Sequence, residues 1–115
     1  MSAGPETLEA KLAALRARFI AERLPLLVDT LDRQARSSAA AGWPAEPTRE
    51  ARRSAHSLKG IAGTHGLTAV SQAAGAVDEI LTAAGKDAPD PALAPRLEDA
   101  LVALRAAATA AFGTD

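Results

Sequence analysis

The sequence predicts an all-α protein, an antiparallel four-helix bundle with an additional short helix at its N-terminal end. Leucine and alanine recur at helical spacing along most of the chain, and almost no run alternates in the β-branched manner of a strand. The segments between these runs are short and rich in glycine and proline. Because 115 residues suffice to bury one core, we expect a single domain over residues 1–115, with its core within about residues 7–112.

The composition excludes several classes of protein. The chain has no cysteine, so it holds no disulfide and no thiolate zinc site. A formal net charge of −1 and only two phenylalanines and one tryptophan argue against nucleic-acid binding, which uses basic surfaces and stacking platforms. The chain also lacks a membrane-spanning apolar run and a secretory signal. We therefore expect a cytoplasmic protein that binds neither nucleic acid nor membrane.

A first helix is expected from Thr7 to Arg23. Its apolar residues recur at helical spacing: Leu8, Leu12, Leu15, Phe19 and Ile20. Thr7 suits an N-cap, and Pro5 could equally open the helix one turn earlier. Pro25 lacks an N–H and disfavours helical geometry at the preceding residue, so we expect a break or kink there.

The second and third helices flank the most loop-like segment of the first half. The second helix carries the next apolar series, Leu27, Val28, Leu31, Gln34 and Ala35. It fades into residues 37–47, SSAAAGWPAEP. The third helix is expected to begin near Thr48, with Pro47 before it and Glu50 in its first turn, and to end around Gly63–Gly66.

The last two helices are separated by the loop GKDAPDP, residues 85–91. The fourth helix is expected from Leu67 or Thr68 to Ala84, with Gly85 as its stop signal. The last helix runs to Phe112, and it is either capped by Asp90–Pro91 or begins nearer Pro95. Four amphipathic helices with short connections, preceded by a shorter one, form an antiparallel bundle.

The third helix has two faces of different chemistry. On a helical wheel, the residues within about 60° of His56 are Arg49, Arg52, Arg53, Lys59, Gly60 and Gly63. The opposite side carries Ala51, Ser54, Leu58, Ile61 and His65. Glycine costs a helix interior about 0.8–1 kcal/mol relative to alanine. The two glycines on the histidine side therefore indicate space cleared in front of an exposed imidazole.

An exposed imidazole among cations indicates a bulky, anionic partner that approaches closely. Histidine is partly neutral at pH 7 and forms covalent intermediates. Phosphoryl transfer depends on positioning and positive charge, so His56 with Lys59 one turn away fits that chemistry. His65 lies about 180° away and is expected to pack or to cap the helix. Two histidines on opposite faces cannot share an ion, so no metal site is expected.

The stretch HSLKGIAGTHG, residues 56–66, resembles the signature of histidine-containing phosphotransfer (HPt) domains of bacterial multistep phosphorelays. That pattern reads H-x-L-K-G-x-A-x-x-x-G, and the matching residues are His56, Leu58, Lys59, Gly60, Ala62 and Gly66. The stretch RFIAERLPLLVDTL, residues 18–31, is similar to the helix that usually precedes the motif. The resemblance covers roughly Phe19 to Leu104.

The resemblance implies a phosphorelay intermediate. His56 would accept a phosphoryl group from the aspartate of a receiver domain and pass it to another receiver. Lys59 would neutralise phosphoryl charge, and Gly60 would leave room for the receiver. The family binds no ATP, has no kinase activity and holds no metal or other cofactor, because Mg²⁺ belongs to the partner. Expected partners are response-regulator receivers and/or a hybrid histidine kinase, and the chain is expected to be a monomer.

The roles of Asp78 and of the three arginines near His56 are each open to two interpretations. Family members often carry glutamine or glutamate on the following helix, where this chain has Asp78, one methylene shorter. Asp78 follows the buried seam by one residue and could accept a hydrogen bond from Nδ1–H of His56, or remain solvated. Arg49, Arg52 and Arg53 could dock a partner or form a solvated face.

Other functions remain as alternatives. A non-catalytic helical module could dock on a receiver or histidine kinase and inhibit it, but it would tolerate loss of His56, Lys59 and Gly60. A histidine-kinase dimerisation helix typically has an acidic residue after its histidine and a proline a few places on. HSLKGIAG has neither.

Overall fold

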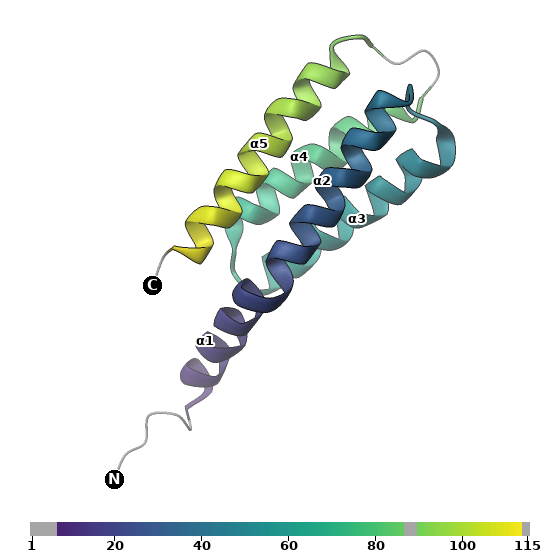
Figure 1. The fold of residues 1–115 in the computed structure, drawn as a ribbon. Coiled ribbons are helices and arrows are strands. Elements are labelled where there is room, and N and C mark those ends of the chain that lie inside the picture. Colours follow the sequence, from purple (N-terminus) through teal and green to yellow (C-terminus); the bar gives the residue numbers. More distant parts are fainter. Residues whose placement is uncertain (1–6, 87–89, 114–115) are drawn as a thin grey trace.

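The computed structural model describes residues 7–86 and 90–113. In this part of the chain every regular element is a helix, as predicted. The elements are α1 (Leu8–Arg18), the π-helical turn η2 (Phe19–Arg23), α2 (Leu24–Ala40), α3 (Ala45–Thr64), α4 (Thr68–Ala84) and α5 (Leu93–Phe112). Helices α2 to α5 form the antiparallel bundle, whereas α1 continues the line of α2 beyond one end of it (Figure 1).

Pro25 does not end the N-terminal helix in a loop, and the irregularity expected there as a break or kink takes the form of a π-turn. The residues before it widen into η2, where the N–H of Leu24 donates to the carbonyl of Phe19, five residues back. In a regular α-helix the proline ring collides with the carbonyl four residues earlier. A single wider π-turn relieves such a collision while the helix continues. Helices α1 and α2 therefore follow one another without a loop.

Most of the apolar series of the predicted first helix lies outside the core, contrary to the amphipathic pattern. Phe19 is buried, but Leu8, Leu12 and Leu15 keep 71%, 54% and 53% of their surface exposed. The reason is position, because α1 projects beyond the end of the bundle (Figure 1). The predicted cap is present, since Thr7 Oγ1 accepts a 3.0 Å hydrogen bond from the N–H of Ala10. The alternative start at Pro5 lies outside the described residues.

The core is made of aliphatic side chains from α2 to α5, together with Phe19 of η2. Its large, fully buried members are Leu24, Leu31, Leu58, Val70, Val77, Leu81, Leu93, Leu97, Leu101 and Leu104. Burying each such side chain contributes about 1.5–3 kcal/mol. Helix α3 buries mainly alanines, at positions 51, 55 and 62, and it forms its most extensive contact with α4. This close contact sets the α3–α4 surface on which the candidate site is built.

Helix α3 begins at Ala45, about one turn before the predicted start. Pro47 lies in its first turn, where a missing N–H costs nothing because that donor has no helical partner. Thr48 is buried, and its hydroxyl lies 2.5 Å from the hydroxyl of Ser38 at the end of α2. The first turn of α3 is thus tied to the preceding helix.

Helix α3 ends where the sequence indicates. Gly66 has a φ of +74°, a left-handed conformation in which a side chain is strained. The N–H of Leu67 donates to the carbonyl of Ala62 over 2.9 Å, and that of Gly66 to Gly63 over 3.0 Å. These two bonds make a Schellman motif, which satisfies carbonyls that the helix end leaves open.

The boundaries of the last two helices also match the prediction. Helix α4 spans Thr68–Ala84 and is followed by Gly85. Helix α5 begins at Leu93, one turn after Asp90, whose Oδ1 accepts a 2.9 Å hydrogen bond from the N–H of Ala92. The observed start lies midway between the two predicted positions. Residues 87–89 of the predicted loop lie outside the described part of the chain.

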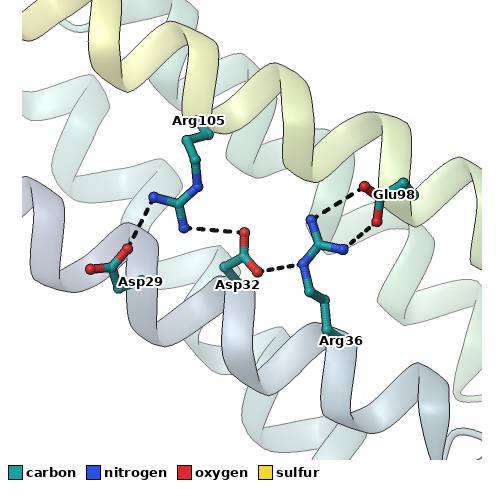
Figure 2. A network of polar contacts seen from close by, with 5 residues as sticks. All are labelled: Asp29, Asp32, Arg36, Glu98 and Arg105. Atoms are coloured by element: carbon teal, nitrogen blue, oxygen red, sulfur yellow. Dashed lines mark hydrogen bonds and ion pairs between the residues drawn. The ribbon is translucent and has the colours of Figure 1, made fainter.

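A network of ion pairs joins α2 to α5 (Figure 2). Asp32 is 8% exposed, and it accepts hydrogen bonds from Arg36 Nε at 2.5 Å and Arg105 Nη2 at 3.2 Å. Arg36 also binds Glu98, and Arg105 lies 3.0 Å from Asp29. Hydrogen bonds to Glu98 and Asp32 raise the pKa of Arg36, and those to Asp29 and Asp32 raise the pKa of Arg105. The buried carboxylate is thus paired on both sides.

Candidate functional site

His56 stands near the middle of α3 with 79% of its side chain exposed. Its position follows from the opposite side of the helix, where Ala51 and Leu58 are buried at 0% and 1% exposure. These packed neighbours fix the rotation of α3 about its axis, because side chains three to four residues apart share one face. His56 is therefore held outward by a rigid helix rather than by a loop.

Asp78, on α4, is the carboxylate beside the imidazole. Its Oδ2 lies 3.6 Å from Nδ1 of His56, and 22% of its side chain is exposed. This distance is an ion-pair separation for a charged imidazole and is longer than a normal hydrogen bond. Nδ1 is the ring nitrogen beside this carboxylate, and 79% of the His56 side chain is exposed.

An open hollow of about 700 Å³ lies beside the imidazole. It is lined by Arg49, Arg52, Arg53, His56, Ser57 and Asp78. Arg49 pairs with Glu46 at 2.8 Å and Arg53 with Glu50 at 3.5 Å, each three residues back along α3. Arg52 has no ion pair within the described residues. Of the basic residues predicted around His56, the three arginines line this hollow and Lys59 does not, whereas Ser57 was not predicted.

Lys59 lies along α4, over a glycine that the sequence analysis did not single out. A Cβ atom added to Gly75 would stand 3.4 Å from Cδ and 3.5 Å from Cε of Lys59. Gly75 is buried in the middle of α4, where glycine is unfavourable. The unfavourable glycine within a predicted helix is the sequence feature that could have indicated a role for Gly75, as it indicated one for Gly60. Nearby, Ser71 Oγ donates a 2.9 Å hydrogen bond to the carbonyl of Lys59 and ties α4 to α3.

The two glycines predicted to clear space have different surroundings. A Cβ added to Gly60 would meet nothing within 4 Å, so this position does face open space. A Cβ added to Gly63 would stand 3.5 Å from Ser71 Oγ of α4. The expectation is therefore wrong for Gly63, which lies against the neighbouring helix because α4 begins beside the last turn of α3.

His65 occupies the C-cap position of α3 and is half-buried. Its ring stacks on Phe19 of η2, with the ring centroids 4.3 Å apart and an interplanar angle of 7°. This is the packed, capping position that the helical wheel predicts. The stacked pair holds the π-turn against the end of α3, and it leaves His56 as the exposed histidine of the bundle.

Together these features define a helical bundle that displays one accessible histidine among cations on a rigid, open surface. This is the arrangement of a histidine phosphotransfer module. The model of the Hpt domain family matches residues 6–107, and the chain belongs to that family, whose role is histidine phosphotransfer in phosphorelays. Searches of curated proteins and of solved structures each returned no match. No helix in the described ranges is long and apolar enough to cross a membrane.

Proposed function

We propose that this chain is a phosphorelay intermediate that accepts a phosphoryl group on His56 from a receiver-domain aspartate and passes it to another receiver. The observation that carries the proposal is the 79% exposure of His56 within a chain of the Hpt domain family. The partners are response-regulator receivers and/or a hybrid histidine kinase. The Mg²⁺ needed for transfer is the partner's, and this chain has no kinase activity of its own.

The transfer is a simple displacement at phosphorus. The lone pair of Nε2 forms the new N–P bond while the O–P bond to the receiver aspartate breaks and its carboxylate is regenerated. The imidazole gains positive charge in this step, and the Asp78 carboxylate, 3.6 Å from Nδ1, stabilises it. The return step reverses these bonds on a second receiver. The protein contributes positioning and charge, which dominate catalysis of phosphoryl transfer.

The neighbouring residues have distinct proposed roles. Lys59 neutralises charge on the phosphoryl group during transfer, and Gly60 gives the receiver open access to the imidazole. Arg49, Arg52 and Arg53 dock acidic residues of the receiver surface. Attraction between exposed charges increases association rates and weakens with added salt.

The test is phosphate transfer from a panel of phosphorylated receivers from the same source. We expect an acid-labile, alkali-stable adduct on the wild-type chain and on His65→Gln, and none on His56→Gln. His65→Gln is the matched control because it removes the other imidazole, which is stacked on Phe19. Labelling that persists in His56→Gln would contradict the assignment. Receivers that bind the chain without ever labelling it would instead indicate the non-catalytic docking module.

A further inference from the structure

The hollow beside His56 lies on one side of the imidazole, toward the N-terminal half of α3. Its lining on α3 is Arg49, Arg52, Arg53 and Ser57, and Lys59 and Gly60 are not part of it. Side chains of a helix lean toward its N-terminus, so the imidazole lies over the turn that holds Arg52 and Arg53. A group bonded to Nε2 is therefore carried toward these arginines.

The charges around this hollow favour an anion. Among the residues that the structure describes, Asp78 is the only acidic one in the lining of this hollow, and that carboxylate lies on the Nδ1 side of the ring. Arg52 has no carboxylate partner in the described residues, although the chain as a whole has a net charge of −1. The pairs of Arg49 and Arg53 with glutamates are exposed, and such pairs contribute little. Guanidinium groups bind phosphoryl oxygens through charge-assisted, often bidentate hydrogen bonds.

We propose that Arg52, with Arg49 and Arg53, forms a phosphoryl-binding site that holds the phosphorylated form of His56 between transfers. The inference rests on the proposed function, because it concerns the phosphorylated state of the same histidine. The proposal assigns different roles to Lys59 and to the three arginines. Lys59, which lies along Gly75, meets the phosphoryl group during transfer with the receiver, and the arginines bind it once the receiver has left.

The experiment uses chemical phosphorylation, so no receiver is required. Phosphoramidate transfers its phosphoryl group to Nε2 as its P–N bond breaks and ammonia leaves. The chain carries His65→Gln throughout, so that only His56 is modified. The pH midpoint of the phosphoryl ionisation is then read from the ³¹P resonance. Arginines beside the phosphoryl group stabilise its dianion and lower that midpoint.

The test variant replaces the three arginines with glutamine, and its matched control replaces three exposed arginines that do not line the hollow. The control set is Arg18→Gln, Arg33→Gln and Arg96→Gln, which changes the net charge equally. We expect the midpoint to rise by about 0.5 unit or more in the test variant and to stay within about 0.1 unit in the control. Arg52→Lys should retain part of the effect, because the charge remains while the bidentate geometry is lost.

Several results would overturn the inference. These are equal midpoints in the test and control variants, a larger shift from Lys59→Gln than from the arginine variant, and failure of phosphoramidate to modify His56. The outcomes separate the two proposals. A chain that is labelled by receivers but shows equal midpoints contradicts the phosphoryl-binding site alone. A chain that shows the arginine shift but takes no phosphate from any receiver contradicts the proposed function alone.

Discussion

Glycines near His56 differ in what fills the place of their missing side chain. Gly60 faces open space, Gly63 faces Ser71, and Gly75 is covered by the hydrocarbon chain of Lys59. Each lies in a helix, where alanine would be more favourable by up to about 1 kcal/mol. A glycine that faces open space makes no packing contact there, so under the proposed function its benefit is access for the receiver. A covered glycine instead positions the side chain that covers it.

Replacing Gly60 with alanine should separate stability from transfer. Because the new methyl group meets nothing within 4 Å, Gly60→Ala should raise the free energy of unfolding by up to about 1 kcal/mol. The same methyl group should slow phosphate transfer, and Gly60→Leu should block it in a folded chain. Urea unfolding and transfer rates measured on the same samples provide the check. A loss of stability that parallels the loss of transfer would show that Gly60 serves packing.

Replacing Gly75 should act through Lys59. Alanine at this position would make an ordinary contact with Cδ of Lys59 at 3.4 Å, so Gly75→Ala should leave transfer nearly unchanged. Gly75→Leu should displace Lys59 and slow transfer about as much as Lys59→Ala does.

A double-mutant cycle is the control for this prediction. If Gly75 acts by positioning Lys59, Gly75→Leu should slow transfer little further once Lys59→Ala is present, because the two changes then affect one contact. Additive losses of transfer rate would mean that Gly75→Leu damages the α3–α4 packing independently of Lys59.

At the scale of elements, the N-terminal helix shows that an apolar pattern by itself does not determine burial. Helices α1 and α2 are continuous through η2, yet α2 buries Leu24, Val28 and Leu31 whereas α1 buries none of its residues. The two helices differ in burial because they have different neighbours. Helices α3 and α5 pack against α2, whereas α1 projects beyond them (Figure 1). Stability should therefore be insensitive to the leucines of α1.

Substituting one exposed and one buried leucine tests this difference. Leu12→Gln should change the free energy of unfolding by no more than about 0.5 kcal/mol, as for other surface positions. Leu58→Ala should cost about 2–5 kcal/mol, because Leu58 is 1% exposed and the change leaves a cavity. Urea denaturation gives both values. A large cost for Leu12→Gln that depends on protein concentration would indicate that α1 packs against a second copy of the chain.

At the scale of the whole molecule, the first and last helices of the bundle are joined by charge as well as by apolar packing. The ion-pair network crosses from α2 to α5, with Asp32 as its buried centre (Figure 2). A buried carboxylate is favourable only when it is fully paired, and both oxygens of Asp32 accept hydrogen bonds from arginines. We therefore expect this residue to matter more than the exposed members of the network.

Asp32 and Asp29 form a matched pair for this test. Asp32→Asn removes the charge at the buried centre and should lower the free energy of unfolding by about 1–2 kcal/mol, as expected for hydrogen bonds to charged groups. Asp29→Asn removes the same charge at a side chain that is 55% exposed and should cost less than about 0.5 kcal/mol. Thermal or urea unfolding of the two variants in parallel decides the matter. Equal costs would mean that burial of Asp32 adds nothing.

Much of the fold and one face of the site could be predicted because their causes are local in sequence. Helical periodicity, Thr7 as a cap and Gly66 and Gly85 as stop signals depend only on nearby residues, and the helices begin and end near the predicted positions. The outward position of His56 also follows from the pattern of α3 alone. Placing His56 opposite Leu58 requires only the geometry of one helix.

What the sequence by itself determined is which residues share a helix and a face: four bundle helices, an exposed histidine and the arginines around it. The tertiary structure decided the relations between helices. It left Leu8, Leu12 and Leu15 exposed, it placed Asp78 at 3.6 Å from His56, and it laid Lys59 over Gly75. The physical reason is the distance along the chain over which each interaction acts. Backbone hydrogen bonds and capping act within a few residues, whereas burial and contact across a seam depend on which neighbour the rest of the chain supplies.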